Sequence, residues 1–476
     1  MSFLFKLKYI TLKDPMVYNR FLFIVTCVLV VFFASCKKKD PVPDIPTPPP
    51  LPPYNSIQLE ASSFTLGNLE KNILDSFVLH YNKPVSVSHI MLLGLCLPDL
   101  KWTSVDSGKI IKFYGLLCGR LGEDYSFEVK VHDIEGKTSM DTVNFSYYYR
   151  KFATQGEIMN YMISDDNNYV WVCTNSPDRI YRFGIADSND KKVFDLNFKP
   201  FKIVLNPYNQ KFYVLNYPHY NTNVDKVFVM DPVSGQIERS ITVNKDRYDD
   251  PQKQIKVYDL AFGANGYGVI NTGTVEYSSS GRWRIIDSRY NDTIYAHPEW
   301  VNSIGGGPGP YYEVVSLQPN YNKSKIYMRF PYAMPRAAVM DVTNGTLSLL
   351  VYPDTNPNHY LVPSKTTDQL FIASYAYQAI VGPRSSQNYS QFDDRYSETA
   401  DFSYRTGESN IMYYRSRDYE YNFNILDYKE ARIRMTTNVG PNFNKISATT
   451  DGKYILAVNN NGLTLFQTKW FYTYAD

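Results

Sequence analysis

The sequence predicts an all-β protein, and two observations carry that prediction. Residues that fit pleated strands are abundant, with 42 tyrosines and 27 phenylalanines in 476 residues. Short alternating or β-branched segments recur between turn signals, whereas long apolar patterns with helical spacing are scarce. Beyond an N-terminal leader and linker, about 420 residues remain, which is enough for two or three domains with hydrophobic cores.

Residues 1–35 are predicted to be a signal peptide. The apolar run from Phe21 to Ser35 is fifteen residues long, and a helix of that length covers about 22 Å of a hydrocarbon core about 30 Å thick. The run is therefore too short to span a bilayer comfortably. Basic residues precede it, as a signal peptide requires: Lys6, Lys8, Lys13 and Arg20.

The leader ends in Phe33-Ala-Ser-Cys36, which resembles a bacterial lipobox because small residues occupy the two positions before the cysteine. Phe33 departs from the usual Leu, Val or Ile of that motif. The resemblance implies that Cys36 is acylated and becomes the mature N-terminus. The alternative is an ordinary secreted protein that is cleaved elsewhere, with Cys36 incidental.

Residues 36–54 join the acylated cysteine to a proline-rich segment. PVPDIPTPPPLPP, residues 41–53, has eight prolines in thirteen positions. Such a segment favours polyproline II, which at about 3.1 Å per residue extends over about 40 Å. We expect a semi-rigid stalk that holds a folded body away from a membrane. A proline-rich ligand for a partner domain is the alternative.

The charge balance argues against a nucleic-acid partner. The whole chain has a formal charge of +2, and residues 1–35 carry four basic groups and one acidic group, so the mature chain is at −1. No net basic field remains to hold a polyanion.

The remaining cysteines allow one disulfide. Cys96 and Cys118 lie in apolar surroundings within the first folded segment, and an exported protein could bridge them. Two free buried thiols are the alternative, because the sequence does not supply the required Cβ geometry. Cys173 lies in Tyr169-Val-Trp-Val-Cys173 and is predicted to be a buried strand residue.

Residues 55–149 are predicted to form a small β-sandwich. Strands are expected at 76–81, 85–88, 125–131 and 142–147, and the third alternates so that one face carries Tyr125, Phe127, Val129 and Val131. The passage LGEDYSFEVKVHDIEGK, residues 121–137, resembles the late hairpin of bacterial immunoglobulin-like domains. That resemblance implies an Ig-like sandwich.

Residues 150–476 repeat a short strand after a turn-like stretch. Successive strand starts are 42, 55, 59, 44, 41 and 43 residues apart, at Val170, Phe212, Tyr267, Ile326, Leu370, Ile411 and Tyr454. A second landmark, an apolar strand that ends in Asp before a turn, runs in phase at Asp231, Asp287, Asp341 and Asp427. One unit has Gln378-Ala-Ile-Val-Gly382 in the place of that strand.

A repeat of about 40 to 45 residues with four strands is typical of a propeller blade. Each blade buries its faces on its neighbours, so seven units predict a seven-bladed β-propeller. The unit FKIVLNPYNQKFYVLN…DKVFVMDPVSGQIERSITV resembles the YVTN-type propeller repeat, with an Asn-Pro turn before a Tyr-Val strand. A parallel β-helix is the structural alternative, although its rungs would be shorter.

No catalytic, cofactor-binding or metal-binding residue is predicted. None of the six histidines pairs at the spacing of a zinc site, and the sequence has no HExxH, GxSxG or CxxC. Ile304-Gly-Gly-Gly-Pro-Gly-Pro310 lacks the Lys-Ser/Thr ending of a phosphate loop. The recurring Asp residues are expected to cap the backbone of turns.

Aromatic residues in extra loops are the predicted ligand contacts. The spacings of 55 and 59 mark added length at about 244–253 and 297–312, and loops on a rigid ring commonly carry binding groups. The candidates are Trp300, Tyr311, Tyr312 and Tyr248 in these loops, and Tyr217 and Tyr220 after a second strand. The alternative is that these rings pack between blades.

Lipid anchor, proline stalk, Ig-like spacer and propeller together resemble the surface lipoproteins of the Bacteroidetes. The resemblance implies attachment to the outer membrane, at the cell surface or on its periplasmic face. Three functions follow as hypotheses: a non-catalytic binder of a glycan or protein ligand, a propeller-fold glycoside hydrolase or lyase, and a structural scaffold of an envelope complex.

Overall fold

The computed structural model describes the folded parts of the chain in segments. These are residues 56–65, 75–92, 101–115, 124–146, 148–218, 224–245, 252, 254–273, 282–295, 316–329, 337–350, 359–364, 368, 370–374, 377–381, 411–415, 422–427, 432–438, 445–459 and 462–468. The predicted signal peptide, Cys36 and the proline-rich stalk lie outside these residues, as do Cys96 and Cys118.

The N-terminal part consists of two antiparallel sheets, ordered β1-β2-β5-β4 and β3-β6-β7. The strands are β1 Leu59–Thr65, β2 Asp75–Tyr81, β3 Ser86–Leu92, β4 Lys101–Val105, β5 Ile110–Gly115, β6 Asp124–His132 and β7 Thr138–Ser146, and a 3-10 helix, η2, covers Asp106–Gly108. Phe77, Leu79 and Phe113 of the first sheet share a core with Phe127 and Val129 of the second. The two sheets therefore pack as a β-sandwich.

The alternation predicted for residues 125–131 is confirmed. Phe127, Val129 and Val131 are buried, and Tyr125 is half-buried against the same core. The turn that follows closes with a hydrogen bond from Gly136 N to Asp133 O of 3.0 Å. Gly136 has a φ of +77°, a conformation that costs glycine little because it has no Cβ.

From residue 150 onward the described residues form seven further sheets, here numbered 1 to 7 along the chain. Sheet 1 has β9 Glu157–Ile163, β10 Tyr169–Asn175, β11 Arg179–Gly184 and β12 Lys191–Asp195, and sheet 2 has β13 Pro200–Asn206, β14 Lys211–Asn216, β15 Lys226–Met230 and β16 Ile237–Thr242. Sheet 3 has β17 Lys256–Phe262, β18 Tyr267–Gly273, β19 Arg282–Asp287, the 3-10 helix η3 Ser288–Tyr290 and β20 Thr293–Tyr295. Sheet 4 has β21 Ser316–Pro319, β22 Lys325–Arg329, β23 Ala337–Asp341 and β24 Thr346–Leu350.

The last three sheets complete the series. Sheet 5 has β25 His359–Pro363, β26 Leu370–Ser374 and β27 Tyr377–Val381, and sheet 6 has β28 Ile411–Arg415, β29 Asn422–Asp427 and β30 Arg432–Asn438. Sheet 7 has β31 Lys445–Ala448, β32 Tyr454–Asn459 and β33 Gly462–Gln467. Its fourth strand is β8 Arg150–Ala153, which precedes sheet 1 in the chain. Every strand start predicted from the repeat lies inside one of these strands. The segment without an Asp, at 378–382, corresponds to β27.

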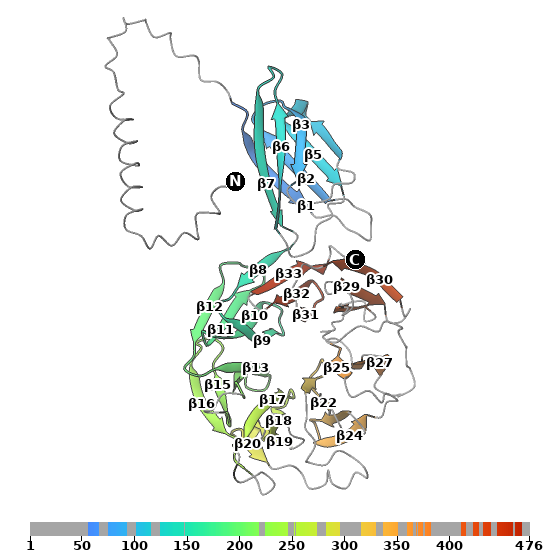
Figure 1. Ribbon diagram of the computed structural model, residues 1–476. Helices are drawn as coiled ribbons and strands as arrows, with labels where there is room; N and C mark the ends of the chain where they lie inside the picture. Colours follow the sequence, from blue (N-terminus) through green and yellow to red (C-terminus); the bar gives the residue numbers. More distant parts are fainter. Residues whose placement is uncertain are drawn as a thin grey trace, which may run out of the picture. The chain divides into compact units, whose positions relative to one another are not determined.

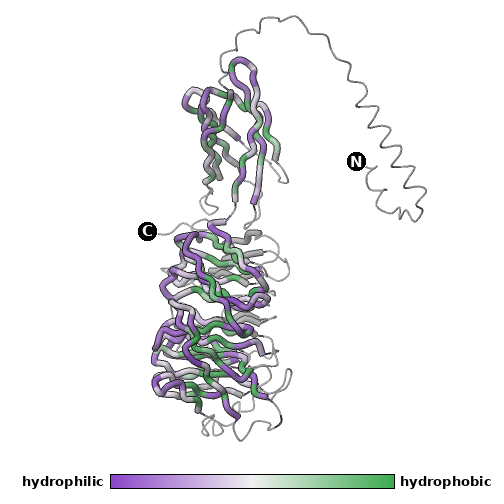
Figure 2. Tube along the Cα trace, turned by 90° about the vertical axis from the view of Figure 1, so that its left-hand side faces the viewer, coloured by the Kyte–Doolittle hydropathy of each residue, from purple (hydrophilic) through white to green (hydrophobic). Residues whose placement is uncertain are grey.

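The sheets succeed one another around a ring (Figure 1). The first strands of successive sheets contact one another, as β9 with β13, β13 with β17 and β17 with β21, so these strands lie nearest the axis. Hydrophobic clusters join neighbouring sheets, because Trp171 of sheet 1 packs with Phe212 of sheet 2, and Trp283 of sheet 3 packs with Met328 of sheet 4. Figure 2 shows hydrophobic segments within the stack and hydrophilic ones along its margins.

Strand β8 joins the start of the ring to its end. It pairs antiparallel with β33, with Ala153 opposite Gly462 and Arg150 opposite Leu465. The guanidinium of Arg150 also reaches sheet 1, where it donates to the carbonyl oxygens of Gly184 at 3.1 Å, Ile185 at 2.9 Å and Ala186 at 3.0 Å. One short strand therefore holds the last sheet and the first sheet together.

Antiparallel order gives the ring two different edges. The turn edge has two turns of each sheet: the one between its first and second strands and the one between its third and fourth strands. The connection edge lies opposite and has the link between the second and third strands and the link to the next sheet. The turns between β13 and β14 and between β15 and β16 are closed by hydrogen bonds, from Gln210 N to Asn206 O at 2.9 Å and from Asp231 N to Gln236 O at 3.0 Å.

Candidate functional site

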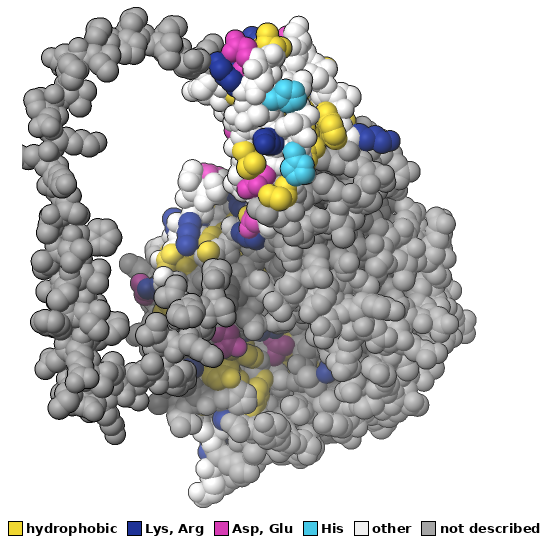
Figure 3. Space-filling view, turned by 45° about the horizontal axis from the view of Figure 1, so that its top comes forward, with side chains coloured by type: hydrophobic (Ala, Val, Ile, Leu, Met, Phe, Trp, Pro, Cys, Tyr) yellow, Lys and Arg dark blue, Asp and Glu magenta, His cyan; other side chains and the backbone are white. Residues whose placement is uncertain are grey.

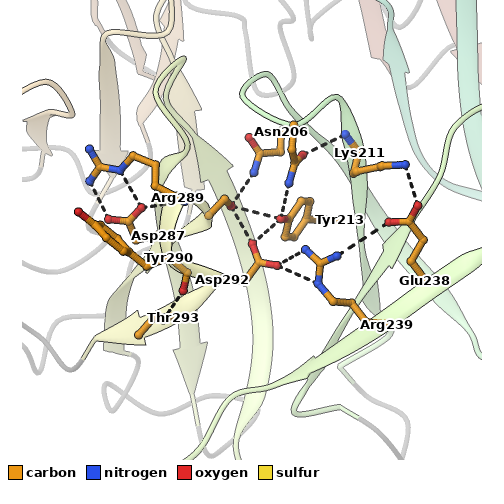
Figure 4. Close-up of polar contacts among 12 residues, drawn as sticks. Asn206, Lys211, Tyr213, Glu238, Arg239, Asp287, Arg289, Tyr290, Asp292 and Thr293 are labelled. Carbon is orange, nitrogen blue, oxygen red and sulfur yellow. Dashed lines mark hydrogen bonds and ion pairs between the residues drawn. The ribbon is translucent and has the colours of Figure 1, made fainter.

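The largest described polar network lies at the turn edge, where sheet 2 meets sheet 3 (Figure 4). At its centre is Asp292, in the turn between β19 and β20, with a side chain that is 1% exposed. Its carboxylate accepts hydrogen bonds from the Tyr213 hydroxyl and from Ser288 Oγ, the second at 2.8 Å. Arg239 of β16 forms an ion pair with it through Nη2 and donates from Nε at 3.1 Å.

Neighbouring side chains satisfy the remaining polar groups of the network. Asn206 Nδ2 donates to Ser288 Oγ at 2.7 Å, and Asn209 Nδ2 donates to the Tyr213 hydroxyl at 3.0 Å. Burial, and then the hydrogen bond to Asp292, raise the pKa of Tyr213 above its usual value. The phenol therefore stays protonated at neutral pH and acts as a donor.

The network around Asp292 links sheet 2 to sheet 3, and we call it the latch. Protein donors already occupy both oxygens of Asp292, and a carboxylate engaged in this way is poorly placed to accept a substrate proton. Buried polar groups that are fully paired fix how two elements pack. We therefore assign the Asp292 network a structural role.

Two further carboxylates organise turns at the same edge. Asp287 binds Arg289 in a bidentate pair, with distances of 2.8 and 2.6 Å, and this interaction holds the pKa of Asp287 below its usual value. Asp231 accepts from the Ser234 hydroxyl at 2.6 Å and from Lys211 Nζ at 3.0 Å, which lower the pKa of Asp231 to about 2. The expected capping role of these landmark Asp residues is confirmed.

The first strands of sheets 1, 2 and 3 share a feature that the sequence did not reveal. Each has a β-bulge at the same distance from its turn, so that Met159, Phe201 and Tyr258 are the extra residues. Bulges re-aim the side chains beside them and are frequent next to functional sites. The residues that follow these bulges are polar: Asn160, Lys202 and Asp259.

These polar residues tie the strands around the axis to one another. Asn160 Oδ1 accepts from the backbone N–H of Ile203 in sheet 2 at 3.3 Å. Asp259 Oδ2 accepts from the backbone N–H of Leu317 in sheet 4 at 2.9 Å, and its Oδ1 forms an ion pair with Lys202 of sheet 2. Lys202 is 24% exposed, so its ammonium group keeps some access to solvent while it holds two strands together.

Acidic and hydrophobic side chains of the described residues show together in a recess of the space-filling view (Figure 3). At the turn edge an ion pair joins Lys323 in the turn of sheet 4 to Asp165 in the turn of sheet 1. Asn167 of sheet 1 also bonds Thr450 of sheet 7, with an Nδ2 to Oγ1 distance of 2.8 Å. The first of these contacts links two sheets that are not neighbours in the ring, and the second links the last sheet to the first.

The strand before each predicted ligand loop ends at the connection edge, and the strand after it begins there. The added length lies between β16, which ends at Thr242, and β17, which begins at Lys256, and between β20, which ends at Tyr295, and β21, which begins at Ser316. Predicted contact residues in these loops and after β14 lie outside the described residues: Tyr220, Tyr248, Trp300, Tyr311 and Tyr312.

Tyr217 is the predicted contact residue that the structure describes. It is half-buried, its ring meets that of Phe201 edge-on at 5.8 Å, and Lys199 Nζ lies 5.2 Å from its ring centroid. Its backbone N–H donates to Lys199 O at 2.8 Å. Tyr217 thus packs against the start of β13. Cys173 is buried in β10, as predicted.

No helix among the described residues has the length and hydropathy to span a membrane. No cluster of three or more His, Cys, Asp or Glu side chains in the same part of the chain could hold a metal ion.

The chain is an all-β protein with propeller-like sheets, several of them four-stranded. No protein family and no curated protein matches its sequence. Among solved structures it is similar to the β-propeller domain of Cps50 (Swd1) from Myceliophteria thermophila, with a TM-score of 0.46 and 8% identity over 67% of this chain and 98% of that chain.

Proposed function

We propose that this chain is a non-catalytic surface lipoprotein, anchored in the outer membrane through Cys36, that binds a glycan or protein ligand at the connection edge of a seven-bladed propeller. The N-terminal sandwich, as an Ig-like spacer, and the proline-rich stalk would carry the ring away from the membrane. No cofactor, metal or nucleic acid takes part in this proposal.

One observation carries the proposal, namely the difference between the two edges. Turns at the turn edge are short, and their polar groups are engaged by neighbouring sheets, as around Asp292. The added length lies at the other edge, between β16 and β17 and between β20 and β21. Extra loop length on a rigid scaffold is where binding groups are commonly placed.

The test is to replace Trp300, Tyr311 and Tyr312 by alanine in the full chain and to measure binding and thermal stability together. A glycan array and an affinity pull-down on the unmodified chain first supply a ligand. Each stacked ring contributes about 0.5 to 1.5 kcal/mol, so the triple variant should bind one to three orders of magnitude more weakly. Its melting temperature should stay close to that of the unmodified chain.

Two outcomes would contradict the proposal. Unchanged affinity in the triple variant would remove these residues from the site. A collapse in melting temperature without a separable loss of binding would show that the rings pack between blades. Turnover of a polysaccharide by the unmodified chain would favour the glycoside hydrolase or lyase hypothesis instead.

A further inference from the structure

The turn edge of sheets 2, 3 and 4 exposes three tyrosine rings. Tyr208 is 53% exposed, Tyr290 is 64% exposed and Tyr321 is 44% exposed. They come from the β13–β14 turn, from η3 and from the β21–β22 turn. In the described part of the ring the only other exposed aromatic side chain is Tyr295, on the outer strand β20.

The turns that carry these rings form one continuous surface. The ring of Tyr208 lies against Gly266, where an added Cβ would come within 2.9 Å of its Cγ. Ser288, at the start of η3, donates its backbone N–H to Gly266 O at 2.9 Å. On the other side, Ala264 N donates to Lys323 O at 2.8 Å. The turn of sheet 3 therefore packs against Tyr208 of sheet 2 and is hydrogen-bonded to the turn of sheet 4.

The backbone that carries the rings is held in place. Tyr208 N donates to Asn206 Oδ1 at 3.0 Å. The guanidinium of Arg289 is fixed by Asp287 and lies beside Tyr290 (Figure 4), 5.8 Å from the centroid of its ring. It also lies 5.7 Å from the ring centroid of Tyr267. Rings on a fixed backbone lose little conformational freedom when a ligand binds.

The cations of this surface are neutralised locally. Five cations in or next to the described turns of sheets 2 to 4 lie within 4.0 Å of a carboxylate: Lys211 of Asp231 and Glu238, Arg239 of Asp292, Arg289 of Asp287, Lys323 of Asp165 and Lys325 of Asp368. An anionic ligand would have to compete with these partners. The surface therefore favours an uncharged ligand.

Two asparagine carboxamides in the turns of sheet 4 add neutral hydrogen-bonding groups to this surface. Asn322 Oδ1 accepts from Ser324 N at 3.0 Å, and Asn344 Oδ1 accepts from Thr346 N at 2.9 Å. Both carboxamides are thereby oriented by their own turns, and an asparagine NH₂ group is a neutral hydrogen-bond donor. Flat rings beside fixed amide donors suit the apolar faces and hydroxyl oxygens of a sugar.

We infer that Tyr208, Tyr290 and Tyr321, with Arg289 beside Tyr290, form a second binding surface that takes a neutral oligosaccharide. The rings belong to three successive sheets, so the ligand is an extended chain of sugar units. This surface lies at the edge opposite to the loops of the proposed function and does not depend on them.

The test uses the full chain, purified in a detergent without a sugar headgroup. Maltoheptaose, cellohexaose, xylohexaose and mannohexaose are the neutral probes, and polygalacturonate is the charged comparison. Saturation-transfer difference NMR detects contact, and calorimetry gives Kd. We expect at least one neutral probe to bind and polygalacturonate to bind more weakly. Replacing the three tyrosines by alanine should raise Kd about 10- to 100-fold.

Two control variants separate the loss of ring stacking on the ligand from a loss of fold stability. The corresponding triple Tyr→Phe variant keeps the rings and should stay within about threefold of the unmodified Kd, whereas Tyr295→Ala should change nothing. Failure of every neutral probe to bind, preference for polygalacturonate, or unchanged affinity in the alanine variant would overturn the inference. If affinity falls only in the Trp300, Tyr311 and Tyr312 variant, the inference fails and the proposed function stands.

Discussion

Asp292→Asn is the most direct perturbation of the latch between sheets 2 and 3. The substitution keeps the size and shape of the side chain and removes its charge. The buried carboxylate loses its ion pair with Arg239, and its two oxygens become one carbonyl oxygen and one NH₂ group. Tyr213 and Ser288 both donate to Oδ1, and Arg239 donates to Oδ2. The new NH₂ group therefore faces either both hydroxyls or the guanidinium, and in each case a donor meets a donor.

The expected loss in the free energy of unfolding depends on how deeply each hydrogen-bond partner of Asp292 is buried. A buried donor left without an acceptor, whether a hydroxyl or the new NH₂ group, costs about 1 to 3 kcal/mol. Arg239 is 39% exposed, so water compensates its lost ion pair and this part costs about 0 to 1 kcal/mol. The free energy of unfolding should therefore fall by about 1 to 4 kcal/mol. With an unfolding entropy of roughly 2.1 cal/mol/K per residue over residues 150–468, this is a fall in melting temperature of about 1.5 to 6 °C.

The assay is differential scanning calorimetry, with Asp195→Asn as the matched control. Asp195 also pairs with an arginine, Arg179, but its side chain is 75% exposed, so its loss should cost less than about 1 kcal/mol. Tyr213→Phe completes a double-mutant cycle with Asp292→Asn, and the two costs should add to more than the cost of the double variant. Equal shifts for Asp292→Asn and Asp195→Asn would refute the reasoning.

Three further predictions concern the anchor, the ring and one titration. Cys36→Ala should abolish labelled palmitate incorporation and membrane retention, and a variant that keeps both would contradict the lipobox interpretation. A chain starting at residue 149 keeps β8 and should be monomeric in light scattering, whereas one starting at residue 154 exposes the edge of β33 and should aggregate; equal solubility would show that β8 is dispensable. Because the folded-state pKa of Asp231 lies at about 2, below its unfolded value, its charge stabilises the fold above about pH 4 and that contribution is lost as the pH falls toward 2. The melting-temperature difference between Asp231→Asn and the unmodified chain should therefore shrink over that range, and a constant difference would contradict the assignment.

The strand pattern was predictable because it is local. The alternation at residues 125–131 and the short strands after each turn are set by the period of the side chains, and both appear in the structure. The landmark Asp residues were predictable for the same reason, since Asp341 caps its own turn through Thr343 N at 2.9 Å. These features depend on residues a few positions apart.

The latch was not predictable, because its members meet only when sheets stack. Tyr213 and Asp292 are 79 positions apart, and SRYND, the segment that holds Asp292, has the composition of an ordinary exposed turn. The bulges at Met159, Phe201 and Tyr258 also lack a signal, because none of them uses the glycine that often marks a bulge. Only the equal distance of these residues from their turns, recognised after aligning the repeats, could have indicated them.

The pairing of β8 with β33 has a consequence for biosynthesis. Strand β8 leaves the ribosome before any other strand of the ring, and its partner β33 leaves it after all the others. Until β33 has been made, β8 has no partner strand, and an unpaired strand edge is a site for misassociation. A nearly finished chain is therefore exposed to misassociation for as long as translation lasts. Any product that stops early lacks its closing sheet, so cellular proteases can recognise it as incomplete.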